Sequence, residues 1–109
     1  MTDKYILGGE DGRTPIPVDD LLEWAHWMES GNRRVAEDHV GLYRVSTVFL
    51  GLDHNFHRVF YGDGPPIVFE TMVFMGLGEV RDEERCSTWD EAVAQHQQVV
   101  SRLKQELSG

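Results

Sequence analysis

The chain has few cysteines and no long apolar run. Cys86 is the only cysteine among 109 residues, so an intramolecular disulfide framework is excluded and a reducing compartment fits best. No segment approaches the roughly 18 apolar residues of a membrane span. The start, "MTDKYILGGEDG", has neither the basic region nor the apolar region of a signal peptide. We therefore expect a cytoplasmic protein without membrane contact.

Strong chemical motifs are also missing from the sequence. It contains no HExxH and no paired CxxC, and "GGEDG" matches neither Gly-rich phosphate fingerprint. We therefore expect no metal and no other cofactor.

Basic residues are scarce. The chain has 10 Lys and Arg against 19 Asp and Glu, a net charge of −9. A phosphate backbone would be repelled at most faces, so direct nucleic-acid binding is not expected. The excess of acidic residues has two interpretations: it keeps the surface soluble, or it forms an acidic face that binds a basic partner.

The length and the pattern of apolar residues predict one α+β domain, residues 1–109. Helical spacing and capping residues predict a helix over 19–30 and another that begins at "STWDEA" and closes the chain. The remaining apolar or charged runs predict strands over 4–7, 33–40, 43–56, 66–76 and 78–87. We expect an antiparallel sheet of about four to five strands with both helices packed on one face.

The segment "DHNFH", which begins at Asp53, poses the first question of function. In a regular strand Asp53 and His54 point to opposite faces, so together they do not hold one metal ion. A metal site would need a further ligand from elsewhere, such as Glu70 or His39. The favoured interpretation is a polar strand end. A binding role of Asp53 or His54 without metal is the alternative.

Glu70 is a carboxylate on an otherwise apolar strand face, beside Val68, Met72 and Phe74. Burial raises the pKa of an unpaired carboxylate, and such a group suits acid–base chemistry. The alternative, which we favour, is an ion pair with an arginine such as Arg44.

The connection after "DHN" gathers aromatic residues. Phe56, Phe60 and Tyr61 either form an exposed contact surface or extend the strands and pack on the sheet. Together with Asp53, His54 and Glu70 they are the candidate binding residues.

Two further side chains that can act as an acid, a base or a nucleophile lie in or just before the last helix. His96 falls in the apolar stripe of that helix, which favours a core histidine with one satisfied ring nitrogen. Cys86 precedes the helix, and a helix N-terminus lowers the pKa of a thiol. No base or orienting group accompanies it in the sequence, so a catalytic thiol is not favoured.

Three strings, "RVSTVFLGLDHNF", "GPPIVFETMVF" and "STWDEAVAQH", resemble a family of small, mostly uncharacterised proteins of bacteriophages and prophages. The resemblance extends from about Leu21 to Leu103. The chain departs from the family pattern at "HRVFYGD" and at Cys86. The resemblance implies a phage accessory protein in the host cytoplasm and implies no activity.

The leading hypothesis is a non-enzymatic module that binds another protein or itself, such as one that modulates a host system. One alternative is a small hydrolase or nucleotide-modifying enzyme that uses Asp53, His54 and Glu70. The other is a homo-oligomeric structural protein.

Overall fold

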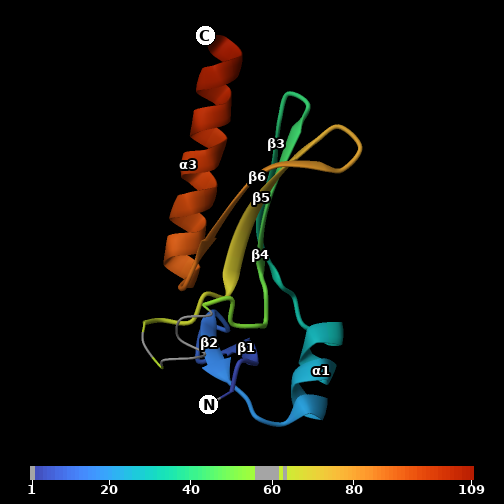
Figure 1. The fold of residues 1–109 in the computed structure, drawn as a ribbon, viewed down its shortest axis with the longest axis vertical. Helices are drawn as coiled ribbons and strands as arrows, with labels where there is room; N and C mark the ends of the chain where they lie inside the picture. Colours follow the sequence, from blue (N-terminus) through green and yellow to red (C-terminus); the bar gives the residue numbers. More distant parts are fainter. Residues whose placement is uncertain (1, 56–61, 63) are drawn as a thin grey trace.

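The computed structural model describes residues 2–55, 62 and 64–109, and its main body is a four-stranded sheet beside a long helix (Figure 1). The strands are β1 (Tyr5–Gly8), β2 (Thr14–Pro17), β3 (Arg34–Val40), β4 (Tyr43–Phe49), β5 (Phe69–Met75) and β6 (Glu79–Cys86). The helices are α1 (Leu21–Ser30) and α3 (Trp89–Ser108). Strands β3 to β6 form one antiparallel sheet in chain order, and β1 pairs with β2 in a second. The α+β class is confirmed.

Both helices begin where their capping residues predict. The Asp20 carboxylate accepts hydrogen bonds from the backbone N–H groups of Leu22 and Glu23, which starts α1. At α3, the Thr88 hydroxyl accepts from Glu91 N, and the Glu91 carboxylate accepts from Thr88 N. This reciprocal pair is the capping box that "STWDE" predicts. Neither described helix is long and apolar enough to cross a membrane.

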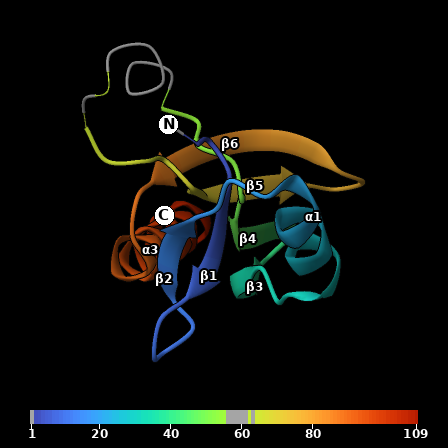
Figure 2. The same ribbon diagram turned by 90° about the horizontal axis from the view of Figure 1, so that it is seen from below.

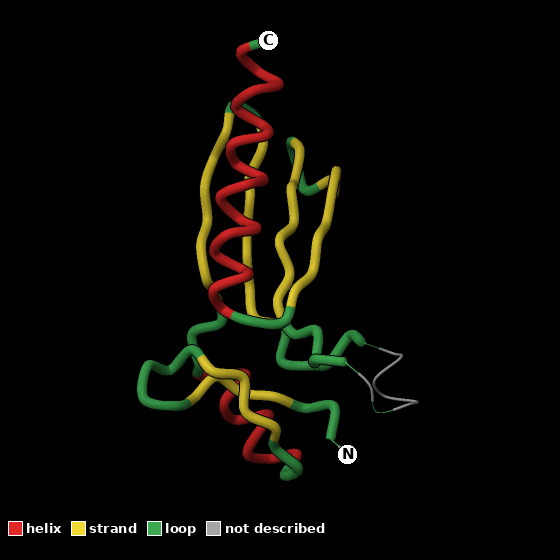
Figure 3. The backbone as a smooth tube through the Cα atoms, turned by 90° about the vertical axis from the view of Figure 1, so that its left-hand side faces the viewer, coloured by secondary structure: helices red, strands yellow, loops and turns green. Residues whose placement is uncertain are grey.

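Helix α3 covers one face of the four-stranded sheet, which we call the inner face (Figure 3). Its buried side chains follow one another at intervals of four, three and four residues: Ala92, His96, Val99 and Leu103. They meet the side chains that point inward from β4 and β5, among them Val45, Phe49, Phe69 and Val73. A stripe of period 3.6 on the helix thus packs against a strand face of period 2.

Helix α1 is placed differently from the expectation that both helices share one face. It lies mainly against β1, and seen from below it is apart from α3, with β1 and β2 between them in the view (Figure 2). Trp27 of α1 packs edge-on against Phe49 at the end of β4, with ring centroids 5.5 Å apart. The small β1–β2 sheet also packs here, because Tyr5 and Leu7 of β1 belong to the same buried cluster as Phe49, and Trp27 packs against that cluster.

Strand β4 ends at Phe49, seven residues before the predicted end at 56. Leu50 still donates its N–H to Val68 O, but Gly51 has a φ of +78° and turns the chain. Helix α1 contacts this glycine, because Trp24 Nε1 donates a hydrogen bond to Gly51 O at 3.0 Å. A Cβ at Gly51 would lie 2.5 Å from Met28 Sδ. The backbone conformation therefore favours glycine, and a Cβ here would in addition displace the end of the Met28 side chain.

Gly51→Ala should lower the free energy of unfolding by about 2–4 kcal/mol, since it combines left-handed backbone strain with a clash against α1. Gly76→Ala is the matched control, because Gly76 also has a positive φ, +61°, but no atom lies within 4 Å of the place that a Cβ would occupy there. That control should lose only the backbone part, about 1–2 kcal/mol. Urea denaturation measures both variants, and equal losses would contradict a cost from displacing the Met28 side chain.

Candidate functional site

A polar layer crosses the core between α3 and the sheet. Thr47 of β4 and Thr71 of β5 are register partners, and their hydroxyl oxygens lie 2.6 Å apart. His96 Nδ1 lies 2.7 Å from Thr47 Oγ1, and His96 Nε2 lies 2.7 Å from Asp38 Oδ2 on β3. Gln95 donates to Thr71 Oγ1 at 2.9 Å and to Glu84 O on β6 at 3.0 Å. The layer thus joins α3 to all four strands.

The order carboxylate, imidazole, hydroxyl in Asp38, His96 and Thr47 is that of a hydrolytic triad. The hydroxyl, however, is inaccessible, since Thr47 is 0%, Thr71 1% and His96 3% exposed. A nucleophile must reach the reacting atom of its substrate, and Thr47 faces only protein. The arrangement therefore satisfies buried polar groups and does not present a nucleophile.

His96 is buried, as its place in the apolar stripe predicts, and both of its ring nitrogens are bonded, not one. Its partners, Asp38 on β3 and Thr47 on β4, and the bond from Thr47 to Thr71 on β5 were missed by sequence reasoning. The available signal was a threonine at the centre of each of two apolar strands, in "VSTVF" and "FETMV". Strand register, which the sequence does not specify, is what brings the two hydroxyls together.

Asp53 is buried and organises the connection between β4 and β5. Its Oδ1 accepts from Asn55 N at 2.8 Å and from Ile67 N at 2.9 Å. Its own N–H donates to Asp3 O at 2.8 Å, which ties the start of the chain to this connection. His54 is half-buried, and its N–H donates to Ile67 O at 2.8 Å. Asp53 thus has a structural role in a loop, as a carboxylate that accepts backbone N–H groups.

Glu70 points to the other face of the sheet, away from α3, which we call the outer face. It is 7% exposed, and its Oε2 accepts from Arg85 Nε at 2.8 Å. The expected ion pair is present, but the suggested partner Arg44 is wrong, because Arg44 pairs with Glu37 at 3.0 Å. Register explains the difference, since Arg85 lies opposite Glu70 on β6 whereas Arg44 lies opposite Phe74.

The predicted site residues are therefore engaged in separate structural contacts. Hydrogen bonds hold the Asp53 carboxylate in the loop, and Glu70 bonds Arg85 on the outer face. In the described part of the chain, no group of three or more His, Cys, Asp or Glu side chains could hold a metal ion. The predicted aromatic contacts Phe56, Phe60 and Tyr61 lie outside the described residues.

The pKa of the Cys86 thiol is raised, whereas its position before α3 suggested that it would be lowered. Burial, with a smaller contribution from the Glu91 carboxylate, raises the pKa of its thiol to about 11. Thr88 O accepts a weak hydrogen bond from Sγ at 3.9 Å. The lowering of the pKa that a helix N-terminus can cause is not seen here, because burial raises the pKa and the Glu91 carboxylate adds to this effect.

Five exposed apolar side chains lie in or next to the β3–β4 turn, the β5–β6 turn and the C-terminal part of α3, three parts of the chain that all lie toward the upper end in Figure 1. We call this surface the apolar end; it comprises Leu42, Met75, Leu77, Val80 and Leu107. Register places Met75 beside Tyr43, the residue after Leu42, and the Leu107 side chain lies against Gly41. Leu42 is 87% exposed and Leu77 fully exposed.

No family model, no curated protein and no solved structure matches this chain. The resemblance to phage proteins therefore stays a prediction.

Thr47→Val should lower the free energy of unfolding by about 1–3 kcal/mol, although the two side chains have nearly the same volume. The change removes a hydroxyl that bonds both His96 and Thr71, and it leaves buried polar groups unsatisfied. Thr47→Ser keeps the hydroxyl and loses one methyl group, and it should cost about 1 kcal/mol. Chemical denaturation of both variants measures the difference, and a Val variant as stable as the native chain would show that the polar layer adds nothing.

Cys86 should react slowly with iodoacetamide. With a thiol pKa of about 11, roughly one molecule in a thousand carries the thiolate at pH 8. Burial is the main cause of the raised pKa, and Glu91→Gln removes the smaller contribution of the Glu91 charge while keeping an acceptor for the capping box, so alkylation at pH 8 should become moderately faster. Asp90→Asn is the matched control in the same helical turn and should leave the rate unchanged. Mass spectrometry follows the reaction, and a native rate equal to that of free cysteine would contradict the raised pKa.

Proposed function

We propose that the chain is a non-enzymatic protein-binding module that works as a phage accessory protein in the host cytoplasm. We further propose that it binds its partner through the apolar end. Its phage origin rests on the resemblance of the three sequence strings, and its mode of binding rests on the exposed apolar side chains.

The clustering of these side chains supports the binding surface. A single exposed leucine is ordinary in a folded protein, whereas several that share one end mark a contact site. The folded chain itself gains little from Leu42 and Leu77, since both remain almost wholly in water. Elsewhere on the sheet, charged side chains of the outer face are paired, as Glu70 is with Arg85 and Glu37 with Arg44.

Charge indicates the partner's chemistry. The chain carries a net charge of −9, and Glu79, exposed in the β5–β6 hairpin, has no ion pair among the described residues. An apolar protein surface rimmed by Lys or Arg would complement this end and would be steered toward it. Two copies of the same acidic chain would repel each other, which disfavours the homo-oligomer.

The enzymatic alternative has weaker support. It requires Asp53, His54 and Glu70 at one accessible site, but Asp53 accepts backbone N–H groups and Glu70 holds Arg85. In the Asp38–His96–Thr47 chain the Asp38 carboxylate is exposed, but the Thr47 hydroxyl and the His96 ring are buried, so a substrate does not reach the hydroxyl. Binding is thus the function that the accessible groups of the described chain serve best.

Leu77→Asp should abolish capture of the partner from phage-infected host cells without changing the melting temperature, because Leu77 is not buried in the free chain. Leu22→Asp is the matched control, since Leu22 is 80% exposed on α1 and does not belong to the apolar end. With the captured protein purified, calorimetry should give a Kd weakened about thirtyfold or more for Leu77→Asp.

Retention of the same protein by the Leu77→Asp variant would rule out the apolar end as the binding surface. Light scattering separates self-association, because a dimer that appears with rising concentration and disappears in Leu77→Asp would identify a second copy as the occupant.

A further inference from the structure

Arg81 of β6 joins the three parts of the chain that carry the apolar end. Its Nη1 and Nη2 donate to the two carboxylate oxygens of Glu106 on α3, at 2.8 and 2.6 Å. Its guanidinium carbon also lies 4.9 Å from the ring centroid of Tyr43, the residue after Leu42. Glu106 directly precedes Leu107, so both contacts lie next to side chains of the apolar end. We call Arg81, Glu106 and Tyr43 the clamp.

A β-bulge directs Arg81 toward α3. The pairing of β5 with β6 shifts between Val73, opposite Asp82, and Phe74, opposite Val80, so Arg81 is an extra residue between the two pairs. Asp82 shares the inner face with Val73, and regular alternation would therefore turn Arg81 outward. The bulge instead brings its guanidinium to the C-terminal part of α3, since bulges redirect side chains.

The Tyr43 ring gives Arg81 a fixed support. Tyr43 is half-buried and packs against the buried cluster that contains Val45 and Leu103. A single exposed ion pair would contribute little to the position of the hairpin. Arg81, however, combines a two-bond contact with the Glu106 carboxylate and a cation–π contact with the ring, and both restrict its orientation.

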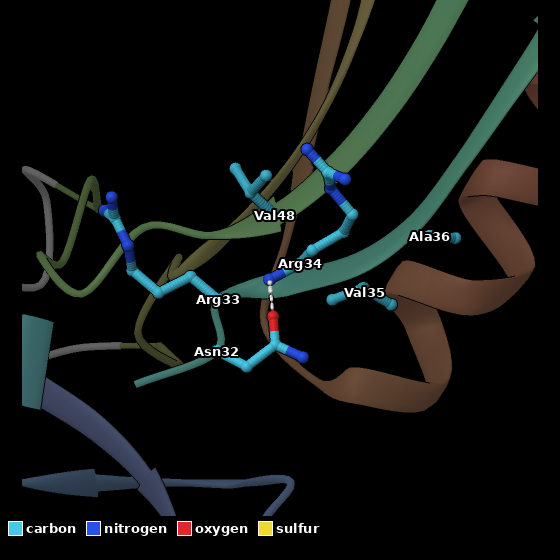
Figure 4. Close-up of a pocket in the computed structure, with 6 residues that line it drawn as sticks. All are labelled: Asn32, Arg33, Arg34, Val35, Ala36 and Val48. Atoms are coloured by element: carbon cyan, nitrogen blue, oxygen red, sulfur yellow. Dashed lines mark hydrogen bonds between the residues drawn. The ribbon is translucent and has the colours of Figure 1, made fainter. Parts of the chain in front are cut away.

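The arginines at the start of β3 do not converge on other elements in this way. They line a pocket of about 660 Å³ at the opposite end of β4 from the clamp. Figure 4 shows the Arg33 and Arg34 side chains pointing away from each other with Val48 between them. Arg33 therefore offers an exposed positive charge that is remote from the clamp and comparable with Arg81.

We propose that Arg81 is a positioning residue for partner binding: the clamp holds the β5–β6 hairpin against the start of β4 and the end of α3, in the arrangement that the partner recognises. This inference rests on the proposed function, because it concerns the same apolar end. Leu77 in the hairpin is fully exposed, so its own side chain does not fix the place of the hairpin. Without the clamp, the hairpin would have to be ordered when the partner binds, and that loss of conformational entropy would weaken the affinity.

NMR relaxation of the free chain tests whether the clamp orders the hairpin. Arg81→Gln should increase backbone motion in the β5–β6 hairpin. Glu106→Gln should act in the same direction, and the double variant should add little, because both changes break one contact. Arg102→Gln is the matched control, since Arg102 also joins α3 to β6, through Glu84, but takes no part in the clamp. Unchanged motion in Arg81→Gln would overturn the inference and leave the proposed function standing.

Calorimetry then measures the binding of a synthetic amphipathic helical peptide of Leu and Lys, which stands in for the apolar, basic surface of the partner. Arg81→Gln should weaken its Kd about tenfold, because the hairpin must then be ordered on binding. Arg33→Gln makes the chain more acidic by the same amount and should bind at least as tightly as the native chain. A loss in Arg81→Gln alone is therefore opposite to the effect of charge.

The outcomes separate this inference from the proposed function. Native affinity in Arg81→Gln would overturn the positioning role of Arg81 alone. A native chain that does not bind the peptide, or a Leu77→Asp variant that binds it equally well, would overturn the binding surface and this inference with it.

Discussion

The hydrogen-bonded layer of Thr47, Thr71, His96 and Asp38 fixes how α3 lies on the sheet. It divides the core into two apolar clusters, one around Phe49 and Phe69 and one around Val45 and Val73. Apolar side chains alone would allow the helix to slide by a turn at modest cost, because leucine and valine contacts are not directional. Bonds from both ring nitrogens of His96 to different strands allow a single position, since any shift would leave buried polar groups unsatisfied.

The outer face of the sheet is stabilised in another way. No described helix covers it, and cross-strand pairs take the place of a second layer. Glu70 and Arg85 are register partners, and the Arg44 guanidinium lies 4.2 Å from the Phe74 ring centroid while it bonds Glu37. Each such pair contributes only a fraction of a kcal/mol to about one kcal/mol, but charges along β6 also discourage edge-to-edge association.

The sequence predicts those elements that local chemistry determines. Asp20 and Thr88 mark the helix starts because a cap involves residues only two or three apart. The pairing of Glu70 with Arg85, and not Arg44, depends on register between β5 and β6, which the pattern of residues does not specify. The raised pKa of Cys86 is unpredictable from the sequence for a similar reason, since it depends on burial and on the Glu91 carboxylate in three dimensions.

The distribution of buried and exposed groups bears on function more than any motif does. The His96 ring and the Cys86 thiol are placed where reaction is suppressed, one by burial and the other by a raised pKa. The groups in contact with water are of another kind: leucines at the apolar end and two arginines at the start of β3. Catalysis requires that a reactive group meet its substrate, whereas recognition requires only complementary exposed surface. Because Thr47 and His96 are buried while apolar side chains at the apolar end remain accessible, the described surface supports the proposed binding function more than it supports catalysis.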